Sequence, residues 1–384
     1  MTVEEGGPGI RSIDVMRREI ATIPQVIVEQ ERLLRPALRA LAEDVGPDLE
    51  EIVLTGCGDS YFAGLATRLA FERVAGIRCR ATEALELTRY ESRYVPRTPP
   101  PLLVAVSYSG EVGRTIEAAA TGAGFGWRTV ALTGRPDGRL ARAVAQPVLM
   151  QVPTLGFSPG TSTYVAMITA LLVLAAELGR ARGRHDAADQ LDDGIARVPT
   201  QASGTLEAAE DPARAAAELI AASPVTTFIG AGPSRATAAF GAAKLFEGPQ
   251  RYGVDQDLEE WAHEQYFVSG PSTPVVVVAP SGAAHDRATE LLAEMAYLGV
   301  PTVVVSDDAT IDHPTAVASA ASIRLPVAAG ADEAVSPLLT CLPLAQVGFF
   351  VSDILGTRAY GFPSAEHERE HYETIHRDTR GEPA

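Results

Sequence analysis

Short apolar runs alternate along the chain with longer Ala-rich segments whose composition favours helices. The runs cover residues 52–55, 102–106 and 129–132 in the first half, and residues 227–229, 275–279 and 302–305 in the second. Runs that are apolar at nearly every position are typical of parallel strands, because helices cover such strands on both faces. The pattern therefore predicts an α/β fold in which each half forms a doubly wound parallel sheet.

The two halves repeat one another at a nearly constant spacing. The motif G-x-G-x-S follows the first run of each half and begins at Gly56 and Gly230, 174 residues apart. The Ser-Gly pairs after the second runs lie 172 residues apart, and the third runs lie 173 residues apart. We therefore predict two flavodoxin-like domains, one over residues 1–200 and one over residues 201–384, with residues 179–215 as an exposed helical connector.

Charge and composition narrow the class of protein. The 384 residues carry a net charge of −17, which argues against nucleic acid and anionic membranes as partners because both reward clustered positive charge. Three scattered cysteines, Cys57, Cys79 and Cys341, form no CxxC pair and fit a reducing cytoplasm. The N-terminal segment shows no secretory signal, and the apolar stretch 164–178 is shorter than a membrane span. We expect a cytoplasmic protein in which that stretch is a buried helix.

One lysine stands out, because Lys244 is the only one of the 32 lysine and arginine side chains that is not arginine. An ammonium is a compact charge that can exchange its proton, whereas a guanidinium stays charged. If the segment is helical, Lys244 and Glu247 lie on one face, and His263 follows Glu247 by sixteen residues. A carboxylate and an imidazole are the usual pair for moving protons on a sugar. A surface ion pair with an unrelated histidine is the alternative interpretation.

Serines and glycines cluster in the turns that follow the first two runs. The first turn carries Gly58 and Ser60, and the second carries Ser107, Ser109 and Gly110. Backbone N–H groups and hydroxyls at strand-to-helix turns suit an anion such as a phosphate, because a helix N-terminus is partly positive. Two alternatives stay open. The serines could be helix caps, and the first turn could bind a dinucleotide, although the third glycine of that fingerprint is absent.

The motif H-E-x-x-H occurs near the C-terminus, at His367, Glu368 and His371. In zinc metalloproteases this spacing places two zinc ligands and a general base on one helix. His376 or Glu373 could supply a third ligand. We interpret the run instead as a solvated polar tail, since short motifs match by chance, and we predict neither a metal site nor a cofactor.

Taken together, these motifs resemble the sugar isomerase (SIS) domain family. The tandem arrangement is similar to the isomerase half of glucosamine-6-phosphate synthase and to related deaminases and deglycases. The resemblance spans residues 14–358. It rests on the two glycine- and serine-rich turns, on the pair Ser162 and Thr163 at the start of a later helix, and on the segment 243–247.

The resemblance implies a role for each matching residue. Five residues of the turns would hold the phosphate of a small-molecule sugar phosphate: Ser60, Ser107, Ser109, Gly58 and Gly110. Three more would contact the substrate elsewhere: Ser162, Thr163 and Tyr108. Glu247 would shuttle a proton between C1 and C2, His263 would help to open the ring, and Lys244 would contact the substrate and tune the glutamate. Members of this kind dimerise and supply the histidine across the interface, so we expect a homodimer.

Departures from the family pattern shape the functional hypothesis. The chain begins Met1-Thr2, so we expect no glutaminase domain with a leading cysteine, and His367 and Glu368 stand near the place of a Schiff-base lysine in the tail of the synthase. Asp59 replaces a hydroxyl residue in the first turn. A carboxylate repels a phosphate unless a cation such as Arg114 pairs with it.

We therefore hypothesise an aldose–ketose isomerase that also releases the amine of an amino-sugar phosphate, through proton transfer by Glu247 and His263. Two alternatives stay open. One is a sugar-phosphate-binding module without catalysis, and the other is a synthase-like aminotransferase that takes ammonia from a separate glutaminase.

Overall fold

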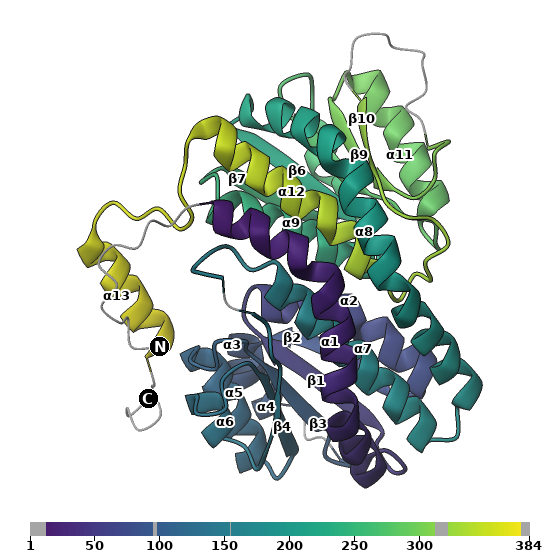
Figure 1. The fold of residues 1–384 in the computed structure, drawn as a ribbon, viewed down its shortest axis with the longest axis vertical. Coiled ribbons are helices and arrows are strands. Elements are labelled where there is room, and N and C mark those ends of the chain that lie inside the picture. The colour runs from purple at the N-terminus through teal and green to yellow at the C-terminus, as the bar shows by residue number, and fades with distance from the viewer. Residues whose placement is uncertain (1–12, 95–97, 154, 312–321, 378–384) are drawn as a thin grey trace.

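The computed structural model describes residues 13–94, 98–153, 155–311 and 322–377. It contains two five-stranded parallel sheets with the strand orders β2-β1-β3-β4-β5 and β7-β6-β8-β9-β10. Within each half, both orders run second, first, third, fourth and fifth strand, which is the flavodoxin-like order. The predicted fold class of two doubly wound parallel sheets is confirmed, and Figure 1 shows the two sheets one above the other with helices packed around them.

The six apolar runs predicted as strands all form strands, and the structure adds four more. The first sheet consists of β1 (Glu51–Gly56), β2 (Arg78–Glu83), β3 (Leu102–Val106), β4 (Arg128–Thr133) and β5 (Gln146–Leu149). The second consists of β6 (Val225–Gly230), β7 (Tyr252–Asp257), β8 (Val275–Val278), β9 (Thr302–Ser306) and β10 (Ser322–Pro326). The six predicted runs correspond to the inner strands. The four strands that the runs missed, β2, β5, β7 and β10, are all sheet edges, where partial exposure interrupts the apolar pattern.

Helices connect the strands and cover both sheets. In the first half they are α1 (Asp14–Val45), α2 (Asp59–Ala70), the π-helical η1 (Phe71–Ala75), α3 (Ala84–Glu86), the π-helical η2 (Leu87–Glu91), α4 (Ser92–Tyr94), α5 (Gly113–Gly124), α6 (Arg139–Arg142) and α7 (Ser162–Ala181). The remaining helices are α8 (His185–Ala221), α9 (Pro233–Glu247), α10 (Leu258–His263), the 3-10 helix η3 (Gln265–Val268), α11 (His285–Leu298), α12 (Pro337–Leu355) and α13 (Ala365–His376).

Two helices, α7 and α12, are apolar around their whole circumference. Each is long and apolar enough to cross a membrane by length and composition, so the prediction that the apolar stretch in α7 is too short was wrong. The structure buries 94% of the most apolar window of α7 and 83% of that of α12 inside the fold. The prediction of a buried helix is thus confirmed, since helices that are hydrophobic all round belong in a core.

The long helix α8 passes through residue 200, the predicted boundary between the halves, and runs alongside both sheets (Figure 1). A stripe that includes Leu191, Ile195 and Val198 is buried, and it packs against α7 and α12. The segment is helical as predicted, but the expectation of an exposed connector was wrong. Apolar residues three and four positions apart gave α8 a face that needed a partner.

The helices that follow the first strand of each half meet between the two sheets. α2 follows β1, α9 follows β6, and α2 packs against α9. Tyr164 of α7 stacks on Phe240 of α9, with ring centroids 4.4 Å apart and an angle of 14° between the rings. This contact zone brings the N-terminal end of α2 close to the C-terminal end of α9, so residues from both halves meet in one place.

Candidate active site

The glycine turns that open α2 and α9 have the same backbone conformation. Gly58 has φ 54° and ψ −130°, and Gly232 has φ 55° and ψ −130°. Residues with side chains rarely adopt such positive φ values, so glycine is required at both positions. Neither helix has a side-chain cap at its N-terminus, which leaves the first backbone N–H groups without that kind of partner. Both turns are therefore built in the way that suits an anion.

Lys244 lies close to the end of α9 and is fully buried. Its Nζ donates to Asp59 Oδ2 at 2.9 Å, to the carbonyl oxygen of Gly160 at 2.9 Å and to Glu247 Oε2 at 2.5 Å. An ammonium has three N–H donors, and the three protein acceptors use all of them. The alternative of a surface ion pair is excluded, because a buried lysine joins the two halves of the chain.

Asp59 pairs with Lys244 and not with Arg114, so the suggested partner was wrong. Arg114 instead forms an ion pair with Glu117 at 2.7 Å. A side chain at residue 160 would collide with Asp59, since a Cβ there would lie 2.6 Å from Oδ2. Glycine at residue 160 thus allows the carboxylate to reach the lysine. No motif in the sequence predicted this contact.

The carboxylate of Glu247 is largely buried but is still partly accessible to solvent. Burial raises its pKa to about 7, Lys244 opposes this rise, and the charge of Asp59 adds to it. About a quarter of the side chain, 24%, stays exposed. The pKa of Lys244 is raised because the attraction of the two carboxylates outweighs burial, which would lower it. The site therefore holds a charged lysine beside a carboxylate that can gain or lose a proton near neutral pH.

Tyr360, which follows α12, is a further partner that the sequence did not reveal. Its backbone N–H donates to the carbonyl oxygen of Glu247 at 2.7 Å, and its hydroxyl bonds the Glu247 carboxylate. Tyr360 has φ 49°, an uncommon value for a residue with a side chain. Burial raises the pKa of Tyr360 well above its usual value, so the phenol is neutral and acts as the donor.

The two serines of the turn after β3 differ in their exposure to solvent. Ser107 is buried, and its Oγ accepts from the N–H of Gly110 at 3.2 Å. Ser109 is exposed, and its Oγ accepts from the N–H of Glu111 at 3.4 Å. The hydroxyl of Tyr108 donates to the carbonyl oxygen of Val152 at 3.1 Å. The serines stabilise the turn itself, while α5 begins without a side-chain cap.

Three other residues expected to contact the substrate lie in α2 or at the start of α7. Ser60 donates to the sulfur of Met167 at 3.4 Å. Ser162 is buried at the start of α7, and its hydroxyl has no hydrogen-bond partner within the described residues. Thr163 lies in the next position of α7, and its Oγ1 is near residue 160. The structure therefore gathers Ser60, Ser162 and Thr163 around the first turn, near Lys244.

The equivalent turn of the second half is filled by carboxylates of the chain itself. After β8, the N–H of Ser281 donates to Asp307 at 2.6 Å, and the N–H of Ala283 donates to Glu333 at 3.4 Å. These carboxylates occupy the donors that an external anion would need. The two halves therefore share a backbone design but differ in what their turns can bind.

His263 does not contact Glu247 among the described residues. It ends α10 with 68% of its side chain exposed, and its Nε2 lies 3.4 Å from Oε1 of Glu259. The helix α10 is fixed at its start by Asp257, whose carboxylate accepts from the N–H groups of Glu259 and Glu260. Within one chain, the histidine is thus held at the surface on a short, capped helix.

The H-E-x-x-H motif lies on α13, where its two histidines contact neighbouring side chains. The Nδ1 of His367 lies 2.8 Å from the Ser364 hydroxyl, and the ring of His371 lies 5.4 Å from that of Phe362. No group of three or more His, Cys, Asp or Glu side chains could hold a metal ion within residues 13–94, 98–153, 155–311 and 322–377. The segment predicted as a solvated polar tail is thus a helix without buried residues.

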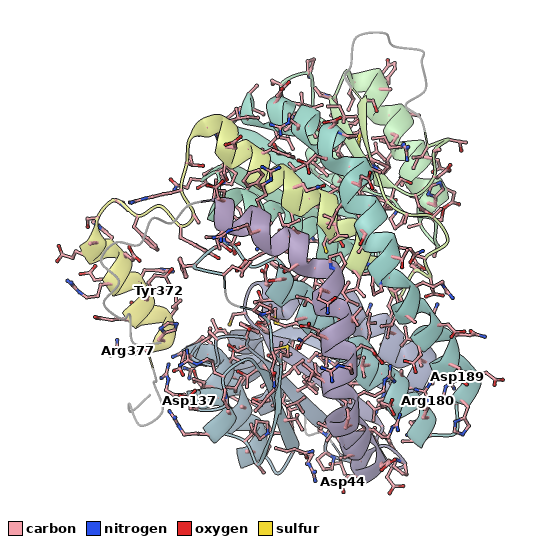
Figure 2. The ribbon with its side chains drawn as sticks, viewed as in Figure 1. Asp44, Asp137, Arg180, Asp189, Tyr372 and Arg377 are labelled. Carbon is pink, nitrogen blue, oxygen red and sulfur yellow. The ribbon has the colours of Figure 1, made fainter. Side chains whose placement is uncertain are left out.

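The end of α13 also reaches the start of α5. Arg139 donates to the carbonyl oxygen of His376 at 2.6 Å, and Arg114 donates to that of Arg377 at 3.2 Å. Figure 2 shows Tyr372 and Arg377 at this end, beside the first half of the molecule. The C-terminal segment thus connects the second half back to the second turn of the first half.

A cavity of about 820 Å³ lies at the end of α12, and its lining includes Arg358 and Gly361 on either side of Tyr360. Its lining includes Gln250, Asp353, Arg358 and Phe362 and contains none of the residues predicted for the site. We place the candidate site at Lys244 and Glu247 instead, because the ionisable groups with altered pKa values and the anion-type turns converge there.

Comparisons with known proteins bear on the family and the fold. Residues 48–177 match the SIS domain family. The glutamine–fructose-6-phosphate aminotransferase (isomerizing) of Gloeobacter violaceus is 28% identical over 323 residues, which cover 83% of this chain and 51% of the relative. The chain thus spans about half the length of the curated relatives that it matches.

Two solved structures share the fold. One is the C-terminal domain of glucosamine-fructose-6-phosphate aminotransferase from Francisella tularensis, with a TM-score of 0.79, 18% identity, and coverage of 91% of this chain and 99% of that one. The other is the glucosamine-6-phosphate deaminase of Thermotoga maritima, with a TM-score of 0.61, 18% identity, and coverage of 87% and 95%.

Proposed function

Because residues 48–177 form a SIS domain and the chain is homologous to the isomerase half of glucosamine-fructose-6-phosphate aminotransferase, we propose that it is a phosphosugar isomerase that acts on an amino-sugar phosphate. The reaction interconverts aldose and ketose forms and releases the amine. The observation that carries this proposal is Glu247, a partly accessible carboxylate whose pKa is raised to about 7. A general base works best when its pKa lies near the working pH.

In the proposed reaction, Glu247 takes a proton from the carbon next to the carbonyl or imine carbon and returns it to the neighbouring carbon. Lys244 and Tyr360 hold the carboxylate in place through its own hydrogen bonds. The turns after β1 and β3 would hold the phosphate through Ser60, Ser107 and Ser109, with Gly58 and Gly110 allowing close approach of the backbone. Ser162, Thr163 and Tyr108 would line the rest of the substrate. No step in this scheme requires a cofactor.

Amine release is favoured over amine transfer by one feature of the sequence. The chain has a single lysine, and the structure buries it between Asp59 and Glu247. A Schiff base needs an amine that can reach the sugar carbonyl, and a fully buried ammonium with three protein acceptors is not available for that role. We propose a cytoplasmic enzyme of the deaminase or deglycase type.

We further propose that the enzyme is a homodimer in which His263 of one subunit completes the site of the other. His263 is exposed, and the neighbouring elements β7 and η3 carry the exposed apolar side chains of Tyr252, Phe267 and Val268. Light scattering would give the mass in solution. Mixed subunits that carry either Glu247→Gln or His263→Ala should regain activity that neither variant has alone, because a hybrid contains one intact site.

The activity is tested by incubating the purified protein with glucosamine 6-phosphate and with a fructosamine 6-phosphate. Released amine and hexose phosphate are measured, and a third reaction supplies fructose 6-phosphate with ammonium to detect amine transfer. Glu247→Gln should lower turnover by about 10²–10⁴-fold, the usual contribution of a general base, while substrate still binds. Binding without turnover on all three would refute an enzyme for these sugars and support a sugar-phosphate-binding module.

A further inference from the structure

Asp59 reaches across the boundary between the two halves of the molecule. It is the first residue of α2, whereas its partner Lys244 lies near the end of α9. Nζ of Lys244 also lies 4.7 Å from the centre of the Phe240 ring, a distance typical of a cation–π contact. The position of the ammonium is thus fixed by Asp59, Gly160, Glu247 and Phe240 together.

The side chain of Asp59 is not explained by its own helix. An aspartate at the start of a helix commonly accepts hydrogen bonds from the first N–H groups. Here the cap of α2 is Gly58, no side chain caps the helix, and Asp59 bonds Lys244 instead. Its second oxygen, Oδ1, is buried without a hydrogen-bond partner in the described part of the chain. A merely structural cap would not leave a carboxylate in this arrangement.

The charges around Nζ do not balance. One ammonium serves two carboxylates, and both bond it directly at 2.9 Å and 2.5 Å. A cation shared in this way stabilises each carboxylate less than it would stabilise one alone, and the two negative charges repel each other across it.

We propose that Asp59 is a positioning residue of the proton-transfer site, which holds the ammonium of Lys244 and keeps part of its charge from Glu247. This proposal rests on the proposed role of Glu247 as the base. Its consequence is a carboxylate at residue 247 that is protonated more easily than a simple lysine–glutamate pair would allow. The raised pKa of Glu247, to which burial contributes first and the Asp59 charge also adds, agrees with this role.

Other ionisable groups near the cluster limit what else could titrate. Tyr360 faces Glu247, while Tyr164 of α7 and Cys341 of α12 lie close to Asp59. Burial raises the pKa of each of these three side chains above its usual value, so all three stay neutral near pH 7. Glu247, Lys244 and Asp59 therefore account for the charge of the cluster.

The test is a direct titration of the Glu247 carboxyl by carbon-13 NMR of protein labelled at glutamate side chains. Glu247→Gln identifies the signal. In Asp59→Asn the midpoint should fall by about one pH unit, because one negative charge is lost and Lys244 serves Glu247 alone. In Lys244→Met the midpoint should rise. The matched control is Asp137→Asn, which removes a 76% exposed aspartate of the first half (Figure 2) and should leave the midpoint unchanged.

A midpoint that stays the same or rises in Asp59→Asn would overturn the positioning role. If that variant does not fold, Asp59→Thr removes the same negative charge and makes the same prediction. The titration does not depend on turnover. A shifted midpoint in a protein without activity would support the role of Asp59 and refute the proposed function. In an active protein, the acidic limb of kcat/KM should move to lower pH by the same amount while KM changes little.

Discussion

Glu247 should make the stability of the protein depend on pH in a direction opposite to that of most carboxylates. Its pKa is raised from 4.5 to about 7 in the folded chain, first by burial and then by the Asp59 charge. The folded state therefore holds a proton that the unfolded chain has lost between these values. The stabilisation is complete below pH 4.5 and disappears as pH rises through 7.

The size of the effect follows from the same two values. A difference of one pKa unit corresponds to about 1.4 kcal/mol, so a rise from 4.5 to about 7 corresponds to about 3 kcal/mol. Because 24% of the side chain is exposed and water screens part of the charge, about 3 kcal/mol is the upper end of what should be measured. This is a large share of the stability of an ordinary domain.

Glu247→Gln isolates this contribution, because glutamine fills the same space and cannot ionise. The free energy of unfolding is measured by urea denaturation of both proteins at half-unit steps from pH 4.5 to 8. Relative to the variant, the wild-type protein should lose up to about 3 kcal/mol across this range, with most of the loss between pH 4.5 and about 7 and half of it complete near pH 6. Parallel curves would refute the reasoning, since they would show that Glu247 ionises in the folded chain as it does in water.

Three further substitutions test other features. Lys244→Met leaves two carboxylates without their cation and should cost about 3–5 kcal/mol at pH 8, and less at pH 5, in the same denaturation assay. Gly58→Ala keeps an open space around the added Cβ but forces φ 54° on a residue with a side chain, so thermal unfolding should show a loss of about 1–3 kcal/mol. Gly113→Ala places a Cβ against the carbonyl group of Arg377 and should release the C-terminal segment, which limited proteolysis would detect as faster cleavage after α12.

The inner strands were predictable from the sequence, and the edge strands were not. β3 and β8 are buried on both faces, so every residue is apolar and the run is visible without any knowledge of the fold. β7 at the sheet edge is only partly buried and contains Asp255, Gln256 and Asp257. Such a strand forms because it pairs with β6, which is not adjacent to it in the sequence. The local sequence pattern therefore predicts the inner strands of each sheet, while the edge strands depend on pairing with strands elsewhere in the chain.

The candidate site shows the same division. Lys244 and Glu247 are three residues apart on one helix, and their pairing followed from helical geometry alone. The contacts of Lys244 with Asp59 and Gly160 span 185 and 84 residues, and Tyr360 comes from a loop with an unusual φ. No periodic pattern encodes such contacts. The family resemblance singled out His263 by its spacing to Glu247, and the structure places it at the surface beside Glu259.

The two halves contribute different parts to the candidate site. In the first half, α2 begins without a side-chain cap, so the turn after β1 can still receive an anion, whereas Ser107 and Ser109 accept from N–H groups of the turn after β3. In the second half, Asp307 and Glu333 fill the turn after β8, so its donors are used internally. The second half contributes the end of α9, with Lys244 and Glu247.

A lysine fits this junction better than an arginine, because three acceptors surround one nitrogen in a fully buried space. A planar guanidinium would spread its donors over a wider fork. Lys244 therefore connects the two halves, because its ammonium bonds Asp59 and Gly160 of the first half and Glu247 of the second.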